Sequence, residues 1–144
     1  MNERQSWLST LAHADVAELE RQWAGLSEQP AYQVLRPAEI GLAMVRGRAG
    51  GTGRPFNLGE MTVTRCAVRL DGVTGFGYVA GRDRRKAELV AVLDALLQTE
   101  RQGPALRRAL LPALEAKRSA ARRARADKVG ASKVDFFTMV RGEG

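Results

Sequence analysis

The sequence is poor in the side chains from which self-contained catalytic sites are usually built. Its 144 residues include one cysteine and one histidine. Cys66 alone excludes an internal disulfide and any metal cluster made of cysteines. His13 alone leaves little for a histidine-rich metal site or a Ser-His-Asp triad, and no set of nucleophile, base and oxyanion donor can be assembled. We therefore expect no active site, metal or cofactor on this chain by itself.

Long apolar segments are lacking too. No stretch reaches the roughly 18 uncharged apolar residues of a membrane span. The first residues, 1–5, do not begin the basic and then apolar pattern of a secretory signal. Hydrophobic residues make up 44% and charged residues 27%, which is typical of a globular protein. We expect one cytoplasmic domain over residues 1–144.

Positive charge is unevenly distributed. The formal net charge is +7, and residues 101–128 hold nine basic and two acidic residues, so that segment carries the whole excess. Nineteen of the 23 basic residues are arginine, which suits bidentate contacts with carboxylates or phosphates. A biased genomic composition would give the same excess of arginine. The basic residues of the segment are Arg101, Arg107, Arg108, Lys117, Arg118, Arg122, Arg123, Arg125 and Lys128.

The first 25 residues predict two short helices. Apolar residues at helical spacing indicate a helix over 3–13 and a second over 16–24, which ends at Gly25. Asp15 and Glu18 have the spacing of a capping box. We expect the two tryptophans to lie in the core, and stacking on nucleic-acid bases is the minor alternative.

The apolar period then changes to two, which indicates strands. Four runs are expected: 32–34 and 40–44, separated by Pro37, then 61–70 and 73–80. Asp71-Gly72 between the last two is a strong hairpin signal. The sequence thus predicts a four-stranded, mainly antiparallel sheet.

A two-residue turn at that hairpin fixes its register. Arg65 should lie beside Tyr78, within reach of a cation–π or hydrogen-bonding contact. Cys66 should face Gly77 as a buried, inert thiol. Gly75 and Gly77 leave one face of the strand without side chains, so that a helix or the backbone of a partner can approach it; we favour a helix.

The remainder predicts two or three helices and an extended tail, giving an α+β fold. Asp83 is the expected N-cap of a helix that Gly103-Pro104 ends. Another helix is expected to start near Pro104. Pro112 is expected to break it and to begin a longer one that ends near Lys128. On that helix Arg118, Arg122 and Arg125 share one face.

Residues 130–144 form an apolar tail, whereas chain ends are usually polar. Two adjacent phenylalanines cannot both face one core from a strand. We expect the tail to dock on another molecule, and the alternative is that it folds back on its own domain. The residues expected to contact a partner are Asp135, Phe136, Phe137, Met139 and Arg141.

A glycine-rich loop follows the second strand run. Consecutive peptide N–H groups can form a nest for an anion, although no Gly-Lys-Ser/Thr motif of a P-loop follows. A flexible strand connection explains the glycines equally well. The candidate phosphate-contacting residues are Arg48, Gly50, Gly51, Thr52, Gly53 and Arg54.

His13 lies at the end of a predicted helix, where a capping or packing role is the default and a catalytic role would need a second titratable group within reach.

Five segments together resemble the PhnG family, small subunits of the bacterial carbon–phosphorus lyase system. They cover nearly the whole chain in order, and the tail motif is quite specific. Cys66 stands where alanine is expected, and the arginine- and alanine-rich helix is the least family-like part. The segments are Trp7–His13, Arg48–Gly53, Thr64–Leu70, Gly81–Glu88 and Ser132–Gly142.

The resemblance implies a two-fold symmetric assembly with the subunits PhnH, PhnI and PhnJ. In its first reaction an alkylphosphonate displaces adenine from MgATP and forms a ribose 1-phosphonate 5-triphosphate, chemistry attributed to PhnI. Carbon–phosphorus cleavage belongs to PhnJ. No catalytic residue of the small subunit is carried over.

We therefore expect a non-catalytic but required subunit of that complex. The alternative is a small basic module that binds nucleic acid through the helix carrying Arg118, Arg122 and Arg125. Its weakness is that the aromatic residues lie away from the basic segment. An independent small enzyme is a third and weaker alternative.

Removal of residues 134–144 should abolish co-purification with the large subunits, because it removes the apolar anchors of the tail. Affinity purification on a tagged large subunit measures this. An intact assembly after the truncation would refute docking through the tail.

Overall fold

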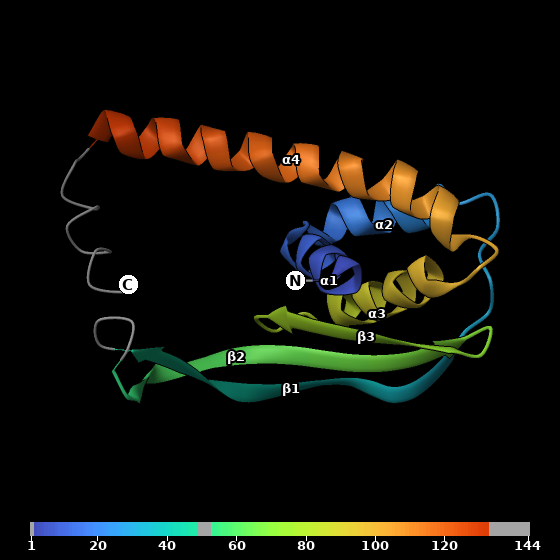
Figure 1. Ribbon diagram of the computed structural model, residues 1–144, viewed down its shortest axis with the longest axis horizontal. Helices are drawn as coiled ribbons and strands as arrows, with labels where there is room; N and C mark the ends of the chain where they lie inside the picture. Colours follow the sequence, from blue (N-terminus) through green and yellow to red (C-terminus); the bar gives the residue numbers. More distant parts are fainter. Residues whose placement is uncertain (1, 49–52, 133–144) are drawn as a thin grey trace.

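Three strands and four helices make up the part of the chain that the computed structural model describes, residues 2–48 and 53–132. The sheet forms one layer, α3 and α1 lie on one side of it, and α2 and then α4 follow beyond them (Figure 1). The α+β class is confirmed. The elements are α1 (Glu3–His13), α2 (Val16–Ala24), β1 (Gln33–Arg48), β2 (Pro55–Leu70), β3 (Val73–Ala80), α3 (Arg84–Gln98) and α4 (Gly103–Ser132).

The sheet is antiparallel with strand order β1-β2-β3. The hairpin at Asp71-Gly72 is confirmed: both residues have positive φ, 50° and 73°, as a type I′ turn requires. The expected register holds, since Leu70 pairs with Val73 and Cys66 with Gly77. The turn dipeptide thus fixed which residues of β2 and β3 share a face.

The strand count is three rather than the four expected. The runs on either side of Pro37 are two parts of one strand, β1. Two register shifts, between Val34 and Arg36 and between Arg36 and Glu39, take up the irregularity. β1 is an edge strand, where a proline without an N–H is tolerated beside a bulge. β2 also begins earlier than expected, at Pro55.

The glycine face of β3 lies directly against α3. A β-carbon added at Gly77 would lie 1.9 Å from the carbonyl oxygen of Ala87, and one at Gly75 would lie 2.0 Å from that of Ala91. Real β-carbons do not come that close to backbone atoms. The expectation that a helix covers this face is therefore confirmed, at backbone-to-backbone contact.

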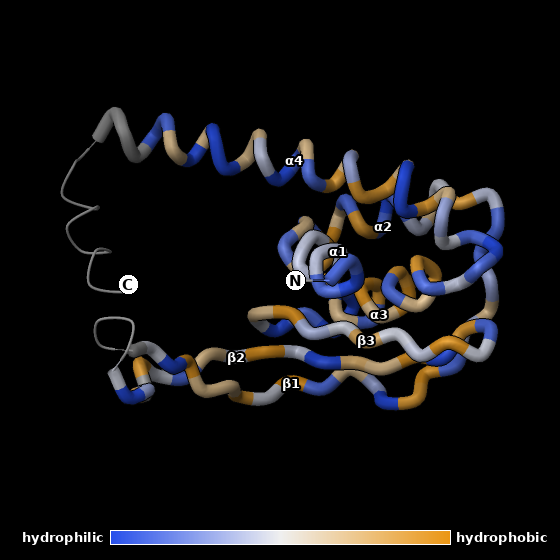
Figure 2. The backbone as a smooth tube through the Cα atoms, in the orientation of Figure 1, coloured by the Kyte–Doolittle hydropathy of each residue, from blue (hydrophilic) through white to orange (hydrophobic). Residues whose placement is uncertain are grey.

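Helix α3 is the centre of the core. Each residue from Leu89 to Leu97 is buried, because the sheet covers one side of the helix and α1, α2 and α4 pack around the rest. Its apolar positions are visible in Figure 2. The predicted cap is confirmed, since the Asp83 carboxylate accepts the Lys86 N–H at 2.9 Å. Trp7 lies in the core, and Trp23 is partly buried against the core. The ring of Trp23 also makes an edge-to-face contact with Tyr32.

One carboxylate, Asp94, lies inside this apolar helix with 0% exposure. It accepts hydrogen bonds from Arg4 in α1 at 2.8 and 3.2 Å, from the Trp7 indole at 2.8 Å and from the Phe76 backbone N–H at 2.9 Å. A buried charge is tolerated when it is paired and fully hydrogen-bonded. Asp94 thereby ties α1, α3 and β3 together.

The capping box predicted at Asp15 and Glu18 is wrong. The Asp15 side chain makes no cap hydrogen bond, and Glu18 is instead held by cationic side chains described below. A complete capping box occurs at α1, where Asn2 and Gln5 exchange hydrogen bonds of 2.8 and 3.0 Å.

The break predicted at Pro112 is also wrong. Helix α4 runs through it for 30 residues. Proline removes the hydrogen bond to the carbonyl of Arg108, but residues 108 and 112 are exposed, so water can replace the missing donor. Helix α3 ends at Gln98, earlier than the end expected at Gly103-Pro104. The start of a further helix near Pro104 is confirmed, since α4 begins at Gly103 and has this proline in its first turn. None of the helices in the described ranges is long and apolar enough to cross a bilayer.

Changing Gly77→Ala should lower the free energy of unfolding by about 3 kcal/mol, because the new methyl group meets the backbone of α3 and no rotamer relieves it. Denaturant unfolding measures the change. Gly41→Ala is the matched control in the same sheet, since a β-carbon there meets nothing within 4 Å, and it should stay within about 0.5 kcal/mol of the native chain. Equal stability of the two variants would contradict the packing.

Candidate functional site

Two of the predicted sites fall outside the described residues. Positions 49–52 of the glycine-rich loop and residues 133–144 of the tail are not described. Phosphate contact by Arg48, Gly50, Gly51, Thr52, Gly53 and Arg54, and docking by Asp135, Phe136, Phe137, Met139 and Arg141, therefore stay predictions. Of the loop residues that the structure describes, Arg54 is exposed.

Arg65 and Tyr78 pair across β2 and β3 as expected. The guanidinium of Arg65 is directed at another partner, however. Its Nε donates to Glu39 of β1 at 2.8 Å, and Arg36 reaches the same carboxylate at 3.4 Å. These exposed ion pairs contribute little stability. Tyr78 is 56% exposed.

The sheet is much longer than the helix that covers it. Sixteen residues of β1 or β2 span about 53 Å at 3.3 Å per residue, whereas the 15 residues of α3 span about 22 Å. In Figure 1 the hairpin of β1 and β2 runs on past α1 and α3. Its far part therefore has no helix over it.

Large apolar side chains are exposed on this uncovered part. Leu42 is 68% and Met44 54% exposed, although the register places both on the side of the sheet that faces α3. We call the group the hairpin patch. Exposed apolar side chains gathered in one region typically mark an interaction site. The register places Met61, opposite Ala43, on the face of the sheet opposite to Leu42 and Met44, so the patch includes both faces. Its members are Leu42, Met44, Phe56, Leu58 and Met61.

The outer edge of β1 adjoins the patch. In an antiparallel ladder the peptide groups of successive residues point alternately toward and away from the neighbouring strand. Continued from the two-residue hairpin through the register, this alternation points the N–H and C=O groups of Ile40, Leu42 and Met44 away from the sheet. No strand pairs with this edge among the residues that the structure describes. Such an edge is a template for an added strand.

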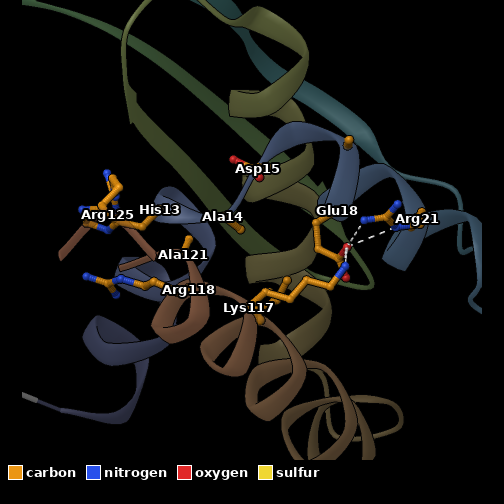
Figure 3. A pocket seen from close by; sticks show the side chains of 11 residues that line it. His13, Ala14, Asp15, Glu18, Arg21, Lys117, Arg118, Ala121 and Arg125 are labelled. Carbon is orange, nitrogen blue, oxygen red and sulfur yellow. Dashed lines mark hydrogen bonds and ion pairs between the residues drawn. The ribbon is translucent and has the colours of Figure 1, made fainter. Parts of the chain in front are cut away.

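A pocket of about 270 Å³ lies between the α1–α2 turn and α4 (Figure 3). Its lining is rich in charge: four cationic side chains and two carboxylates, together with His13. His13 is exposed, and its Nδ1 lies 2.8 Å from the carbonyl oxygen of Ser9 in its own helix. The charged lining residues are Asp15, Glu18, Arg21, Lys117, Arg118 and Arg125.

Glu18 is the best-held carboxylate of the pocket. Lys117 of α4 donates to it at 2.8 Å and Gln22 at 3.1 Å, and Arg21 forms a further ion pair (Figure 3). The hydrogen bonds from Lys117 and then from Arg21 and Gln22 lower the pKa of Glu18 to about 2. Glu18 thus fastens α4 to α2, which is a structural task.

The remaining reactive side chains do not form a catalytic group. Cys66 is buried, and burial raises the pKa of its thiol, which keeps it protonated and inert. Within residues 2–48 and 53–132, no three histidine, cysteine or acidic side chains come together as a metal site would require.

Sequence reasoning missed Asp94 and misassigned Glu18. The sequence does contain a signal for Asp94, because it is the one charged residue in the apolar run 89–97. A charged side chain that is buried with such a run needs hydrogen-bonding or ionic partners. The sequence contains no comparable signal for the contacts of Glu18, because its main partner, Lys117, is 99 residues away along the chain.

Glu18→Gln should lower the free energy of unfolding by about 2 kcal/mol at pH 7, after allowance for the partly exposed partners. The pKa of Glu18 is lower in the folded chain than in the unfolded chain, so the ionised carboxylate stabilises the fold. This stabilisation is complete above pH 4.5 and is lost as the pH falls toward 2. The difference from the native chain should therefore shrink by about half at pH 3, as unfolding at both pH values would show.

Glu28→Gln serves as the control. It removes an exposed ion pair with Arg101 and should change stability little at either pH. A Glu18→Gln effect that did not change with pH would contradict the assignment.

Comparison with known proteins gives one consistent result. The family model described as phosphonate metabolism protein PhnG matches residues 2–142. A relative from Rhizobium meliloti (strain 1021), described as alpha-D-ribose 1-methylphosphonate 5-triphosphate synthase subunit PhnG, is 42% identical over 142 residues, which cover 98% of this chain and 90% of the relative. The resemblance found in the sequence is thereby confirmed, and the chain belongs to the PhnG family of phosphonate metabolism proteins.

Proposed function

We propose that this chain is a subunit of an alpha-D-ribose 1-methylphosphonate 5-triphosphate synthase complex that takes part in the use of phosphonates. The observation that carries the proposal is the 42% identity to a subunit of that name over nearly the full length of both chains. The other subunits would be PhnI, PhnH and PhnJ, with two copies of each in a two-fold symmetric assembly.

The role proposed for this chain is required but non-catalytic. The complex would displace adenine from MgATP by an alkylphosphonate, with the reacting groups supplied by PhnI. The state of the reactive side chains on this chain supports the division, because Cys66 is buried and His13 bonds the backbone of its own helix. The contribution of this chain to the complex would then be a surface that binds other subunits.

The surface best suited to a partner subunit is the hairpin patch with the outer edge of β1. Burial of a leucine or methionine side chain is worth about 1.5–3 kcal/mol, and Leu42 and Met44 are exposed together on the same strand. The free peptide groups of that edge can pair with an extended segment of the partner. Together they offer both apolar burial and directional hydrogen bonds.

The double change Leu42→Gln with Met44→Gln should greatly reduce recovery of this chain on a tagged large subunit after co-expression. Both side chains are exposed in the free chain, so its own stability should change by no more than about 0.5 kcal/mol. Affinity purification followed by sizing measures the assembly.

The matched control is Val34→Gln with Leu35→Gln. These side chains are exposed on the same strand at its other end, and the control should assemble like the native chain. Equal recovery of both variants would exclude the hairpin patch as the contact.

A further inference from the structure

The second half of α4 is a helix without a covering layer. Every residue from 120 to 128 is exposed. The helix extends past α1–α3 toward the same end of the molecule as the uncovered part of β1 and β2 (Figure 1). We call residues 120–128 the α4 arm. Isolated helical turns gain little stability in water, so a helix continued this far beyond its core needs a reason.

Most of the basic residues that precede the arm are held by acidic side chains. Of the five at positions 101–118, Arg108 has no described ion pair and four have an acidic partner: Arg101 with Glu28, Arg107 with Glu3, Lys117 with Glu18 and Arg118 with Glu115. The arm then places three arginines within four positions, and none of them has an ion pair within the described ranges. These are Arg122, Arg123 and Arg125.

Helix electrostatics does not account for these arginines. Basic residues stabilise a helix from its last turn, and the last turn of α4 contains none. Arg118, Arg122 and Arg125 stand at i, i+4 and i+7, where like charges destabilise the helix. The spacing of these three arginines therefore does not stabilise the isolated helix.

We propose that the α4 arm binds an acidic surface of a partner subunit, which deepens the proposed function and rests on it. Arginine suits this task, because its guanidinium pairs with carboxylates bidentately. Ala120 and Ala121 precede the arginines and Ala124 lies among them, and these small side chains allow a protein surface to approach the helix closely. The position of the arm, toward the end of the molecule where the hairpin patch lies, lets one partner contact both.

Nucleic acid fits the arm less well. Non-specific binding of single strands relies on aromatic side chains beside the cations. The arm has no aromatic residue, and the exposed rings Phe56, Phe76 and Tyr78 belong to the sheet. The observations thus favour an acidic protein surface.

The test is charge reversal of the arm in the full chain, Arg122→Glu with Arg123→Glu and Arg125→Glu, co-expressed with a tagged large subunit. The measurement is the salt concentration that washes half of the chain off the immobilised partner. Facing like charges across an interface cost several kcal/mol, so binding should weaken about 100-fold or more and release should occur at much lower salt.

The matched control is Arg82→Glu with Arg84→Glu and Arg108→Glu. These arginines are exposed and have no described ion pair. Each reversal removes two units of charge, so both triple variants fall from +7 to +1, and only the position of the change differs. Circular dichroism of the two variants should show equal helix content.

Release of the arm variant alone at lower salt supports the proposal, and release of both variants at the salt of the native chain overturns it. If the native chain itself fails to bind the partners, the proposed function fails, and the inference with it. A 260 nm absorbance that the native chain carries and the arm variant loses, with partner binding unchanged, would overturn the proposal in favour of nucleic acid.

Discussion

The fold depends on the close approach of α3 to β3 over Gly75 and Gly77. Because no side chain separates them, carbonyl oxygens of α3 lie 1.9 and 2.0 Å from the places that β-carbons would occupy. This brings Asp94 close enough to bond the Phe76 N–H at the edge of the sheet, and Arg4 and Trp7 of α1 complete that carboxylate's shell. One short helix is thus fixed on the sheet and also holds the N-terminal helix.

The same contact explains why much of the sheet stays open. Helix α3 matches the eight residues of β3 in length, but β1 and β2 are twice as long. A single helix of about 22 Å cannot cover strands of about 53 Å. Leu42 and Met44 stay exposed although they lie on the covered side of the sheet, and α4 likewise extends beyond its own core. Contact with a partner subunit would explain both the uncovered part of β1 and β2 and the extension of α4.

Local chemistry made much of the fold predictable. The Asp71-Gly72 turn fixed the register of β2 and β3, the two glycines of β3 indicated a helix over them, and apolar spacing gave both N-terminal helices their bounds. The failures came from tertiary context. Pro112 breaks a helix only where its lost hydrogen bond is not replaced, and Pro37 divides a strand only where a bulge cannot absorb it.

The candidate site was less accessible from sequence. Exposure of Leu42 and Met44 follows from the unequal lengths of β1 and α3, which alternating apolar residues do not reveal. The partners of Glu18 come from α4, far along the chain. The excess of positive charge in residues 101–128 was visible at once, but which arginines lack an acid depends on the folded arrangement.

We propose that another subunit completes the uncovered end of the sheet. Hydrogen–deuterium exchange over residues 38–46 of β1, compared between the free chain and the assembled complex, tests it most directly. We expect fast exchange of the outward-facing amides of Ile40, Leu42 and Met44 in the free chain and strong protection in the complex. Unchanged exchange at these amides in a verified complex would contradict it.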